Sequence, residues 1–352
     1  MGARDDIIAT VQKMVKKPLK IAVLGCGYWG PNLVRNFSKD KNSEVVMVVD
    51  KDYSRLKYIR KLYPKIIVSQ NISDCFIKNA CDAVVVSLPV SMHYAVVEKA
   101  LKDNKHVFCE KPLAESVSQT EKLFKLAGER KRVLFVDYTY IYSNEIRYLK
   151  KICKKLGDGI YTIDMRRLSF GIFQKDIDVI LDLAPHDISI LIYLLGEPEK
   201  VLTVGHAHIN RKIVDDAHLV FVYKRGLLAH IHVSWLFPKK VRDITIVAKN
   251  KMIVYDDTKT KDKIEIVKKG VSLQNLPKPP YYATYRDFAY RYRVGKGFIP
   301  KIAKTEPLEI ACREFLKKVL QDQSNDANLS LKVARILETS KDSLRGQSFI
   351  HV

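Results

Sequence analysis

The chain has 352 residues, of which 47% are hydrophobic and 9% aromatic, as in a globular protein large enough for two domains. Lys and Arg outnumber Asp and Glu by 61 to 39, which gives a formal net charge of +22 at pH 7. The basic residues are spread along the chain without a nucleic-acid-binding motif, so we expect a solvated basic surface that favours anionic small molecules, and no nucleic-acid partner.

The sequence also bears on the cellular compartment. No apolar run approaches the roughly 20 residues that a membrane span needs, so we expect no membrane partner. Residues 1–17 carry Asp5 and Asp6 among dispersed apolar residues, which predicts an N-terminal helical extension and not a secretory signal. None of the six cysteines lies in a C-x-x-C pair, which favours a reducing, cytoplasmic environment over a disulfide framework.

A dinucleotide-binding turn is expected near the start of the first domain. The apolar segment 21–24 predicts a buried strand, and it runs directly into Gly25, Gly27 and Gly30, followed by a helical pattern at 32–37. The G-x-G-x-x-G spacing between a strand and a helix suits a pyrophosphate, which would bind at the helix N-terminus. The alternative is a tight turn that binds no ligand.

A second apolar strand, at 45–49, ends in Asp50, which lies twenty positions after Gly30. An acidic residue in this place binds the ribose hydroxyls of NAD and repels the 2′-phosphate of NADP. We therefore expect NAD as the cofactor; the alternative is a solvated aspartate at a strand end.

The strand–helix alternation continues to residue 138. Further strands are expected at 66–68, 83–87, 105–109 and 133–136, and helices at 53–63, 71–78, 92–104 and 116–130. This alternation predicts a doubly wound parallel sheet, and hence an NAD-binding Rossmann domain over residues 18–138.

Residues 139–352 have a different character. Helices are expected at 143–156, 180–195, 308–321 and 329–344, an irregular aromatic connector at 281–299, and strands at 161–168, 201–208, 218–223, 227–233, 243–248, 251–255 and 263–268. The fold class is therefore α/β plus α+β, with a large, mostly antiparallel sheet in a domain for substrate binding and oligomerisation.

Lys111 is the first catalytic candidate. It follows the fifth expected strand, and ligands of a parallel sheet bind beyond the carboxyl ends of its strands. A lysine there can lower the pKa of a substrate hydroxyl and stabilise a developing alkoxide. Leu88, Pro89 and His93 follow the neighbouring strand. The alternative is a surface lysine in a turn.

Asp182 and His186 form the second catalytic candidate. They are four residues apart and share a face if the segment is helical, and Pro185 suggests that the helix begins near this point. A histidine titrates near neutral pH, which suits removal of a hydroxyl proton as hydride leaves the carbon. Asp182 would orient the ring or bind a neighbouring hydroxyl; the alternative is a structural His–Asp pair at a helix N-terminus.

Two histidine pairs, His206 with His208 and His230 with His232, have a spacing that would place both side chains on one face of a strand. Neither pair has a cysteine or carboxylate cluster near it, so no metal site is expected.

The chain resembles the Gfo/Idh/MocA oxidoreductases, which include glucose–fructose oxidoreductase and inositol dehydrogenase, over about residues 18 to 347. The resemblance rests on Gly25-x-Gly27-Tyr28-Trp29-Gly30, Leu88-Pro89-x-x-x-His93, Glu110-Lys111-Pro112 and Asp182-x-x-x-His186. Segments 136–140 and 180–188 are similar to the branch that acts on nucleotide-linked sugars, such as the UDP-N-acetylglucosamine and UDP-glucuronate 3-dehydrogenases. One departure is Asp137, where many relatives have a small residue.

This resemblance implies an NAD-dependent sugar dehydrogenase that forms a homodimer or homotetramer through its open-faced sheet. It implies that Lys111 orients substrate and nicotinamide, that His186 is the acid/base, and that Asp182 supports the substrate. The implied cofactor-binding residues are Gly25, Gly27, Tyr28, Trp29, Gly30, Asp50, Leu88, Pro89, His93, Glu110 and Lys111. Tyr140, Arg166, Arg167 and Lys239 are further candidates for the pyrophosphate or uridine of a nucleotide sugar.

We expect hydride transfer at a sugar ring carbon, C3 of a UDP-sugar. The alternatives are a dehydrogenase of a free sugar or inositol, and a non-catalytic NAD-binding regulator, against which the intact Lys111 and His186 argue.

Overall fold

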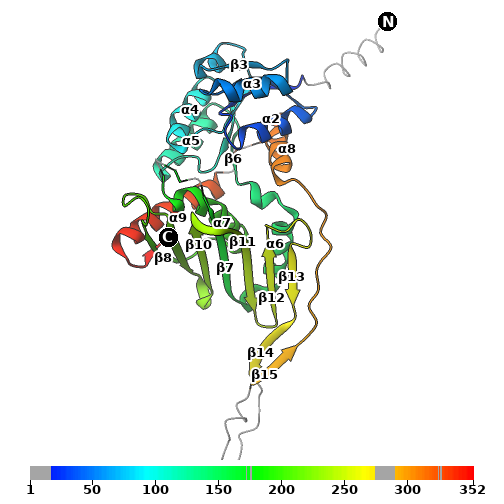
Figure 1. Ribbon diagram of the computed structural model, residues 1–352, viewed down its shortest axis with the longest axis vertical. Coiled ribbons are helices and arrows are strands. Elements are labelled where there is room, and N and C mark those ends of the chain that lie inside the picture. Colours follow the sequence, from blue (N-terminus) through cyan, green and yellow to red (C-terminus); the bar gives the residue numbers. More distant parts are fainter. Residues whose placement is uncertain (1–16, 172, 175–176, 274–289, 324, 326) are drawn as a thin grey trace, which may run out of the picture. The chain divides into compact units, whose positions relative to one another are not determined.

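The computed structural model describes residues 17–171, 173–174, 177–273, 290–323, 325 and 327–352, which divide into two compact units (Figure 1). Unit 1 comprises Met1–Thr139 and Glu306–Leu331, and unit 2 comprises Tyr140–Thr305 and Lys332–Val352. The expected N-terminal helical extension falls on residues 1–17, all but the last of which lie outside the described residues.

Unit 1 contains a six-stranded parallel sheet in the order β3-β2-β1-β4-β5-β6, which confirms the expected doubly wound fold. Its strands are β1 (Leu19–Leu24), β2 (Ser43–Val49), β3 (Ile67–Ser69), β4 (Ala83–Val86), β5 (His106–Glu110) and β6 (Leu134–Asp137). The central strands β1 and β4 are almost wholly apolar and buried, because helices cover both faces of a doubly wound sheet.

The helices of unit 1 are α2 (Gly30–Lys39), α3 (Tyr53–Leu62), α4 (Val90–Lys102), α5 (Val117–Glu129), α8 (Pro307–Leu320) and the 3₁₀ turn η1 (Ile72–Phe76). Helix α8 comes from the last third of the chain, which the sequence analysis assigned to the second domain. It packs on unit 1 because Phe315 contacts Phe37 and Phe108, while Glu306 pairs with Arg35 and accepts a hydrogen bond from Asn36.

Unit 2 is built on an eight-stranded sheet in the order β13-β12-β11-β7-β10-β9-β8-β16. Neighbouring strands are antiparallel except for β7 and β10, which confirms the expected mostly antiparallel sheet. The strands are β7 (Ile160–Phe170), β8 (Lys200–His206), β9 (Asp216–Val222), β10 (Leu228–Ser234), β11 (Leu236–Ala248), β12 (Lys251–Asp256), β13 (Ile264–Val267) and β16 (Ile350–His351).

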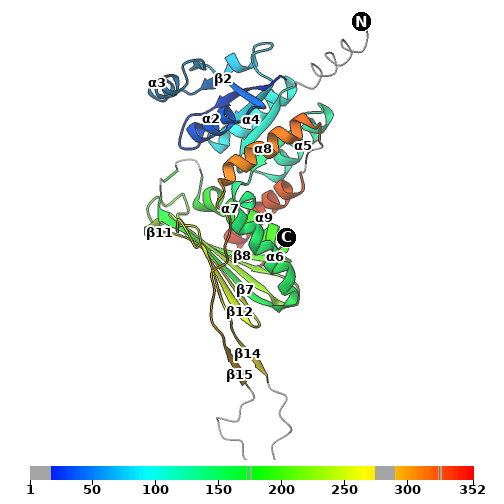
Figure 2. The same ribbon diagram turned by 90° about the vertical axis from the view of Figure 1, so that its right-hand side faces the viewer.

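The helices of unit 2 lie along one face of this sheet (Figure 2). They are α6 (Asn144–Leu156), α7 (Val179–Leu195) and α9 (Asn328–Gly346), with 3₁₀ turns η2 (Thr139–Tyr142), η3 (Gly157–Gly159) and η4 (Lys224–Gly226). Along β9 and β10, buried residues alternate with half-exposed ones. The alternate, half-exposed side chains therefore line the opposite face, which we call the open face.

The connector expected at 281–299 is irregular only in part. Strand β15 (Tyr290–Val294) pairs with β14 (Lys269–Leu273) in a small antiparallel sheet, so the expectation was wrong for those five residues. Residues 274–289 lie outside the described residues. Across the part of the chain that the structure describes, no helix has the length and apolar character that crossing a membrane requires.

Candidate active site

The glycine turn joins β1 to α2, and two of its glycines are required by close packing. Gly25 has a φ of +91°, and a Cβ there would lie 2.2 Å from the Ser87 carbonyl oxygen. A Cβ on Gly30 would lie 2.3 Å from the carbonyl oxygen of Gly25. Neither position accepts a side chain, so the strand, turn and helix are held close together.

The middle glycine of the motif, Gly27, leaves space for a ligand. A Cβ on Gly27 would meet no atom closer than 3.9 Å, so the backbone of the turn is accessible there. No side chain caps the N-terminus of α2, whose first residues include Pro31. An accessible backbone beside an uncapped helix N-terminus fits the pyrophosphate of a dinucleotide, and Tyr28 and Trp29 flank the same turn.

Asp50 follows β2, and its carboxylate contacts the glycine turn. One oxygen accepts the backbone N–H of Cys26 at 2.6 Å, and the other accepts that of Asp52 at 2.8 Å. The guanidinium of Arg55 lies 3.5 Å from the same carboxylate. An acidic residue here suits the ribose of NAD, whereas a nearby arginine suits the 2′-phosphate of NADP, so both determinants are present.

His93 connects the loops that follow β4 and β5. Its two ring nitrogens each lie 2.8 Å from a backbone carbonyl oxygen, those of Pro112 and Leu88. The side chain is buried, and burial lowers its pKa despite these two hydrogen bonds. His93 therefore fixes the loop that carries Lys111, and the Lys111–Pro112 bond in this loop is cis.

A pair of buried carboxyl groups lies beside Lys111. Glu110 and Asp137 are direct neighbours on β5 and β6, and both are buried. Burial and the charge of Asp137 raise the pKa of Glu110 to about 8. Burial raises the pKa of Asp137 to about 7, although Thr139 donates a hydrogen bond to it at 2.8 Å and Lys111 acts in the opposite direction. Asp137, where many relatives have a small residue, therefore forms with Glu110 a pair of buried carboxyl groups whose pKa values are both raised.

We expect the substitution Asp137→Asn to flatten the pH dependence of stability. The folded chain keeps these carboxyl groups protonated up to about pH 7 to 8, whereas the unfolded chain loses the protons near pH 4. Stability is therefore lost as the pH rises through this window. Between pH 5 and pH 8 the free energy of unfolding should therefore fall by a smaller amount in the variant than in the parent, with a difference of at least about 1 kcal/mol.

Urea unfolding at the two pH values measures this difference, and Glu115→Gln, at an exposed carboxylate, is the matched control. An Asp137→Asn protein with the pH dependence of the parent would show that Asp137 is ionised in the folded chain at pH 5.

Asp182 and His186 both lie on α7, one turn apart. The helix begins at Val179, within one residue of the expected start at 180, because Asp178 caps it by accepting the Leu181 N–H at 2.8 Å. The suggestion that Pro185 lies near the start was wrong, because Pro185 lies inside the helix. Trp235 donates its indole N–H to Asp182 at 3.1 Å. The carboxylate of Asp182 is thereby fixed at the edge of the first helical turn.

The His186 ring lies edge-to-face against Tyr140, with the ring centroids 5.1 Å apart. The Tyr140 hydroxyl accepts hydrogen bonds from Arg167 at 3.1 Å and from Arg242 at 3.0 Å. Arg167 in turn forms a two-point ion pair with Asp187, at 2.7 and 3.0 Å. This buried group holds the helical turn that carries His186.

Two of the residues suggested for a pyrophosphate are thus committed elsewhere. Arg167 is buried against Asp187, and Arg166 pairs with Asp243 at 2.9 Å. The sequence did not reveal that Arg167 forms a buried ion pair with Asp187. An aspartate in the middle of an apolar helix was the available sign that a basic partner is needed. Lys239, by contrast, is exposed on β11. Glu110, Lys111 and His93 lie together in unit 1, and Asp182 and His186 lie together in unit 2.

Two family models match the chain. One describes an oxidoreductase family with an NAD-binding Rossmann fold, over residues 19–138, and the other the Gfo/Idh/MocA C-terminal domain, over residues 159–254. Fold and matches together define an oxidoreductase with an NAD(P)-binding Rossmann domain. The chain belongs to the Gfo/Idh/MocA family, as the sequence motifs indicated.

Relatives of known activity act on sugars. UDP-N-acetylglucosamine 3-dehydrogenase of Acidithiobacillus ferrooxidans is 31% identical over 166 residues, 47% of this chain and 52% of that protein. Its solved structure superposes with a TM-score of 0.73 at 22% identity, covering 93% of this chain and 98% of that one. The chain spans little more than half the length of the first curated relatives it matches.

Two further solved structures differ in their cofactor. A 3-ketoreductase from Actinomadura kijaniata, in complex with TDP-benzene and NADP, has a TM-score of 0.76 at 17% identity and covers 93% of this chain and 98% of its own. A protein of gentamicin A biosynthesis, in complex with NAD, has a TM-score of 0.77 at 16% identity and covers 96% of this chain and 97% of its own. At these identities the likeness describes the fold, and both cofactors occur on it.

Proposed function

We propose that the protein is an NAD-dependent dehydrogenase of a nucleotide-linked sugar, which transfers hydride between a ring carbon, C3 of a UDP-sugar, and the nicotinamide. The observation that carries the proposal is the Asp182–His186 pair on the first turns of α7, held by Trp235 and Tyr140. The Tyr140 ring packs against His186, and the next residue, Asp187, is fixed by its buried ion pair with Arg167. A histidine that is held in place in this way is suited to acid/base catalysis.

The roles follow from chemistry at each position. Lys111 carries a positive charge at the end of β5, where it lowers the pKa of a substrate hydroxyl and stabilises negative charge on its oxygen. His186 removes the hydroxyl proton in the oxidation and returns it in the reduction. Asp182 accepts a hydrogen bond from the substrate or from His186. When bound, NAD supplies the hydride acceptor. Glu110, Asp137 and His93 position Lys111 and its loop.

Two features favour a nucleotide-linked substrate. The relative with 31% identity is named for UDP-N-acetylglucosamine, and the Actinomadura structure holds TDP-benzene. The chain also carries a net charge of +22, which attracts a diphosphate. We assign the exposed Lys239 and Lys240 on β11 as candidate diphosphate contacts.

A substrate panel tests the activity. The protein is mixed with NAD and, one at a time, UDP-N-acetylglucosamine, UDP-glucuronate, UDP-glucose, a TDP-sugar, free glucose and myo-inositol, and the absorbance of reduced nicotinamide is followed. Product mass spectrometry identifies the oxidised carbon. Turnover with a UDP-sugar and none with the free sugars supports the proposal. Clear NAD binding without turnover on any compound would favour a cofactor-sensing regulator.

The cofactor preference should depend on Asp50. We expect Asp50→Asn to weaken NAD binding by about tenfold and to strengthen NADP binding, because the charge that repels the 2′-phosphate is removed while Arg55 remains. The asparagine still offers one oxygen to the Cys26 N–H, which keeps its contact with the glycine turn, and it loses the contact with the Asp52 N–H. Calorimetric titration of the protein with NAD and with NADP measures both affinities. The control Arg55→Gln should weaken NADP binding alone; equal effects of Asp50→Asn on the two cofactors would contradict this assignment.

A further inference from the structure

A cluster of metal-binding side chain types lies on the open face of the unit 2 sheet, on two neighbouring strands. Asp216 and His218 are two residues apart on β9, so they point to the same face. His218 is directly opposite His232 of β10 in the antiparallel register. The strand register and the alternation of side chains therefore place two imidazoles and one carboxylate side by side. From the sequence no metal site was expected, because no carboxylate cluster was recognised near the histidine pairs.

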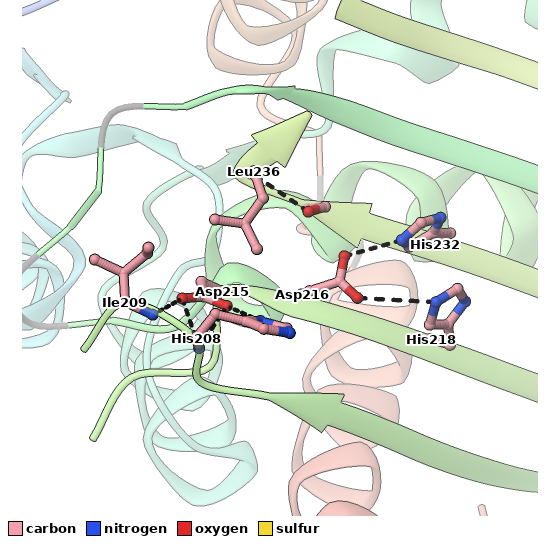
Figure 3. A network of polar contacts seen from close by, with 8 residues as sticks. His208, Ile209, Asp215, Asp216, His218, His232 and Leu236 are labelled. Atoms are coloured by element: carbon pink, nitrogen blue, oxygen red, sulfur yellow. Dashed lines mark hydrogen bonds and ion pairs between the residues drawn. The ribbon is translucent and has the colours of Figure 1, made fainter. Parts of the chain in front are cut away.

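The three side chains meet at their polar atoms (Figure 3). The Nε2 atom of His232 lies 3.0 Å from one carboxylate oxygen of Asp216, and the Nε2 atom of His218 lies 3.9 Å from the other. The two imidazole rings are nearly parallel, with centroids 3.9 Å apart. One possible ligand atom from each residue lies within 4.8 Å of the others.

We propose that Asp216, His218 and His232 form a binding site for one divalent transition-metal ion of the Zn²⁺ type on the open face of the unit 2 sheet.

The distances suit such an ion. Zn²⁺ binds imidazole nitrogen and carboxylate oxygen at about 2.0–2.2 Å, so two ligand atoms in its tetrahedral geometry are roughly 3.4 Å apart. The contact of Asp216 with His232, at 3.0 Å, and its contact with His218, at 3.9 Å, lie on either side of this separation. Two imidazoles with one carboxylate are a common ligand set for zinc and related ions, and water would complete the coordination.

A second layer of contacts orients the histidines. The other ring nitrogen of His218, Nδ1, lies 3.1 Å from Nε2 of His230, and Nδ1 of His230 lies 3.8 Å from Asp164 of β7. Metal-bound histidines usually have such a partner on the second nitrogen, because the partner sets the tautomer and the ring orientation, and for His218 that partner is His230. This row of side chains leaves Nε2 of His218 directed at Asp216.

In a single chain the site is reachable from solvent, and the pairing of β9 with β10 holds its side chains in place. The side chains of His218, Asp216 and His232 are 39%, 25% and 14% exposed, so an ion can enter while β9 and β10 hold the ligands. The neighbouring Asp215 points the other way and is occupied, because it accepts hydrogen bonds from the backbone of His208 and Ile209 (Figure 3). Asp215 therefore does not compete for the ion.

Titration of the tag-free, chelator-treated protein with Zn²⁺ by calorimetry tests the site, together with the visible absorption of Co²⁺ as a spectroscopic probe. We expect about one ion per chain, Co²⁺ bands of a nitrogen- and oxygen-bound ion, a higher melting temperature with Zn²⁺, and no comparable binding of Mg²⁺. Each of His218→Gln, His232→Gln and Asp216→Asn should weaken Zn²⁺ binding at least tenfold.

The control is His351→Gln, which removes an exposed histidine of the same sheet on β16 and should leave Zn²⁺ affinity unchanged. Circular dichroism of the metal-free variants verifies that each remains folded, so that lost binding reports lost ligands. Wild-type protein that binds no Zn²⁺, or variants that bind it as tightly as the wild type, would overturn the proposal. Such results would leave the three residues as a hydrogen-bonded surface group.

Discussion

Replacing Lys111 by Met is expected to lower kcat by about 10²- to 10³-fold on the substrate that the panel identifies, with NAD affinity little changed. The methionine keeps the length of the side chain but removes the charge that stabilises the substrate oxygen. Replacing His186 by Asn should lower kcat by about 10²- to 10⁴-fold, since the base that takes the hydroxyl proton is lost. Initial rates at saturating NAD, with NAD affinity from calorimetry, measure both effects.

The double variant shows whether the two residues serve one step. Groups that act as a unit are far from additive, so Lys111→Met with His186→Asn should be about as slow as the slower single variant. Lys65→Met and His351→Asn, at exposed positions, are the matched controls and should retain full activity. Normal turnover in both single variants would overturn the assignment of these two residues. An unaltered kcat in the His186 variant alone would transfer the acid/base role to another group.

The features that sequence reasoning predicted depend on short stretches of chain. The glycine turn could be recognised because two of its glycines, Gly25 and Gly30, are required by close contacts with Ser87 and Gly25, and any strand–turn–helix unit of this kind makes such contacts. Asp50 and Lys111 could be placed because each directly follows a strand, and the ends of parallel strands lie at one edge of the sheet. Position along the chain was sufficient in these cases.

The features that were missed depend on pairing between distant segments. Asp216, His218 and His232 become one group only through the register of β9 with β10. Helix α8 belongs to unit 1 because Phe315 packs against Phe37, a contact between distant segments that no local sequence pattern reveals.

The start of α7 agrees with the expected helix at 180–195, but Pro185 was wrongly interpreted as a sign of that start, because proline is common in the first turn of a helix. Here the cap at Asp178 and the buried residues that follow it outweigh the hydrogen bond that Pro185 cannot donate, a cost of about 3 kcal/mol.

Replacing Arg167 by Met should destabilise the protein by about 3–5 kcal/mol, because it leaves the Asp187 carboxylate buried without its partner. The two side chains are only 6% and 3% exposed and meet through two hydrogen bonds. Burial by itself lowers the pKa of Arg167, but the charge of Asp187 more than offsets this and keeps the guanidinium protonated. Urea unfolding at pH 7 measures the loss.

The double variant Arg167→Met with Asp187→Leu separates the charge from the packing. Two apolar side chains leave no buried charge, so most of the lost stability should return, whereas two independent losses would add. Tyr140 would keep its hydrogen bond from Arg242 but lose that from Arg167, so the ring against His186 would be held less firmly. We therefore expect a stable protein whose kcat is reduced by about tenfold. Full activity in this stable variant would mean that the ion pair serves folding alone and that His186 is positioned by its helix.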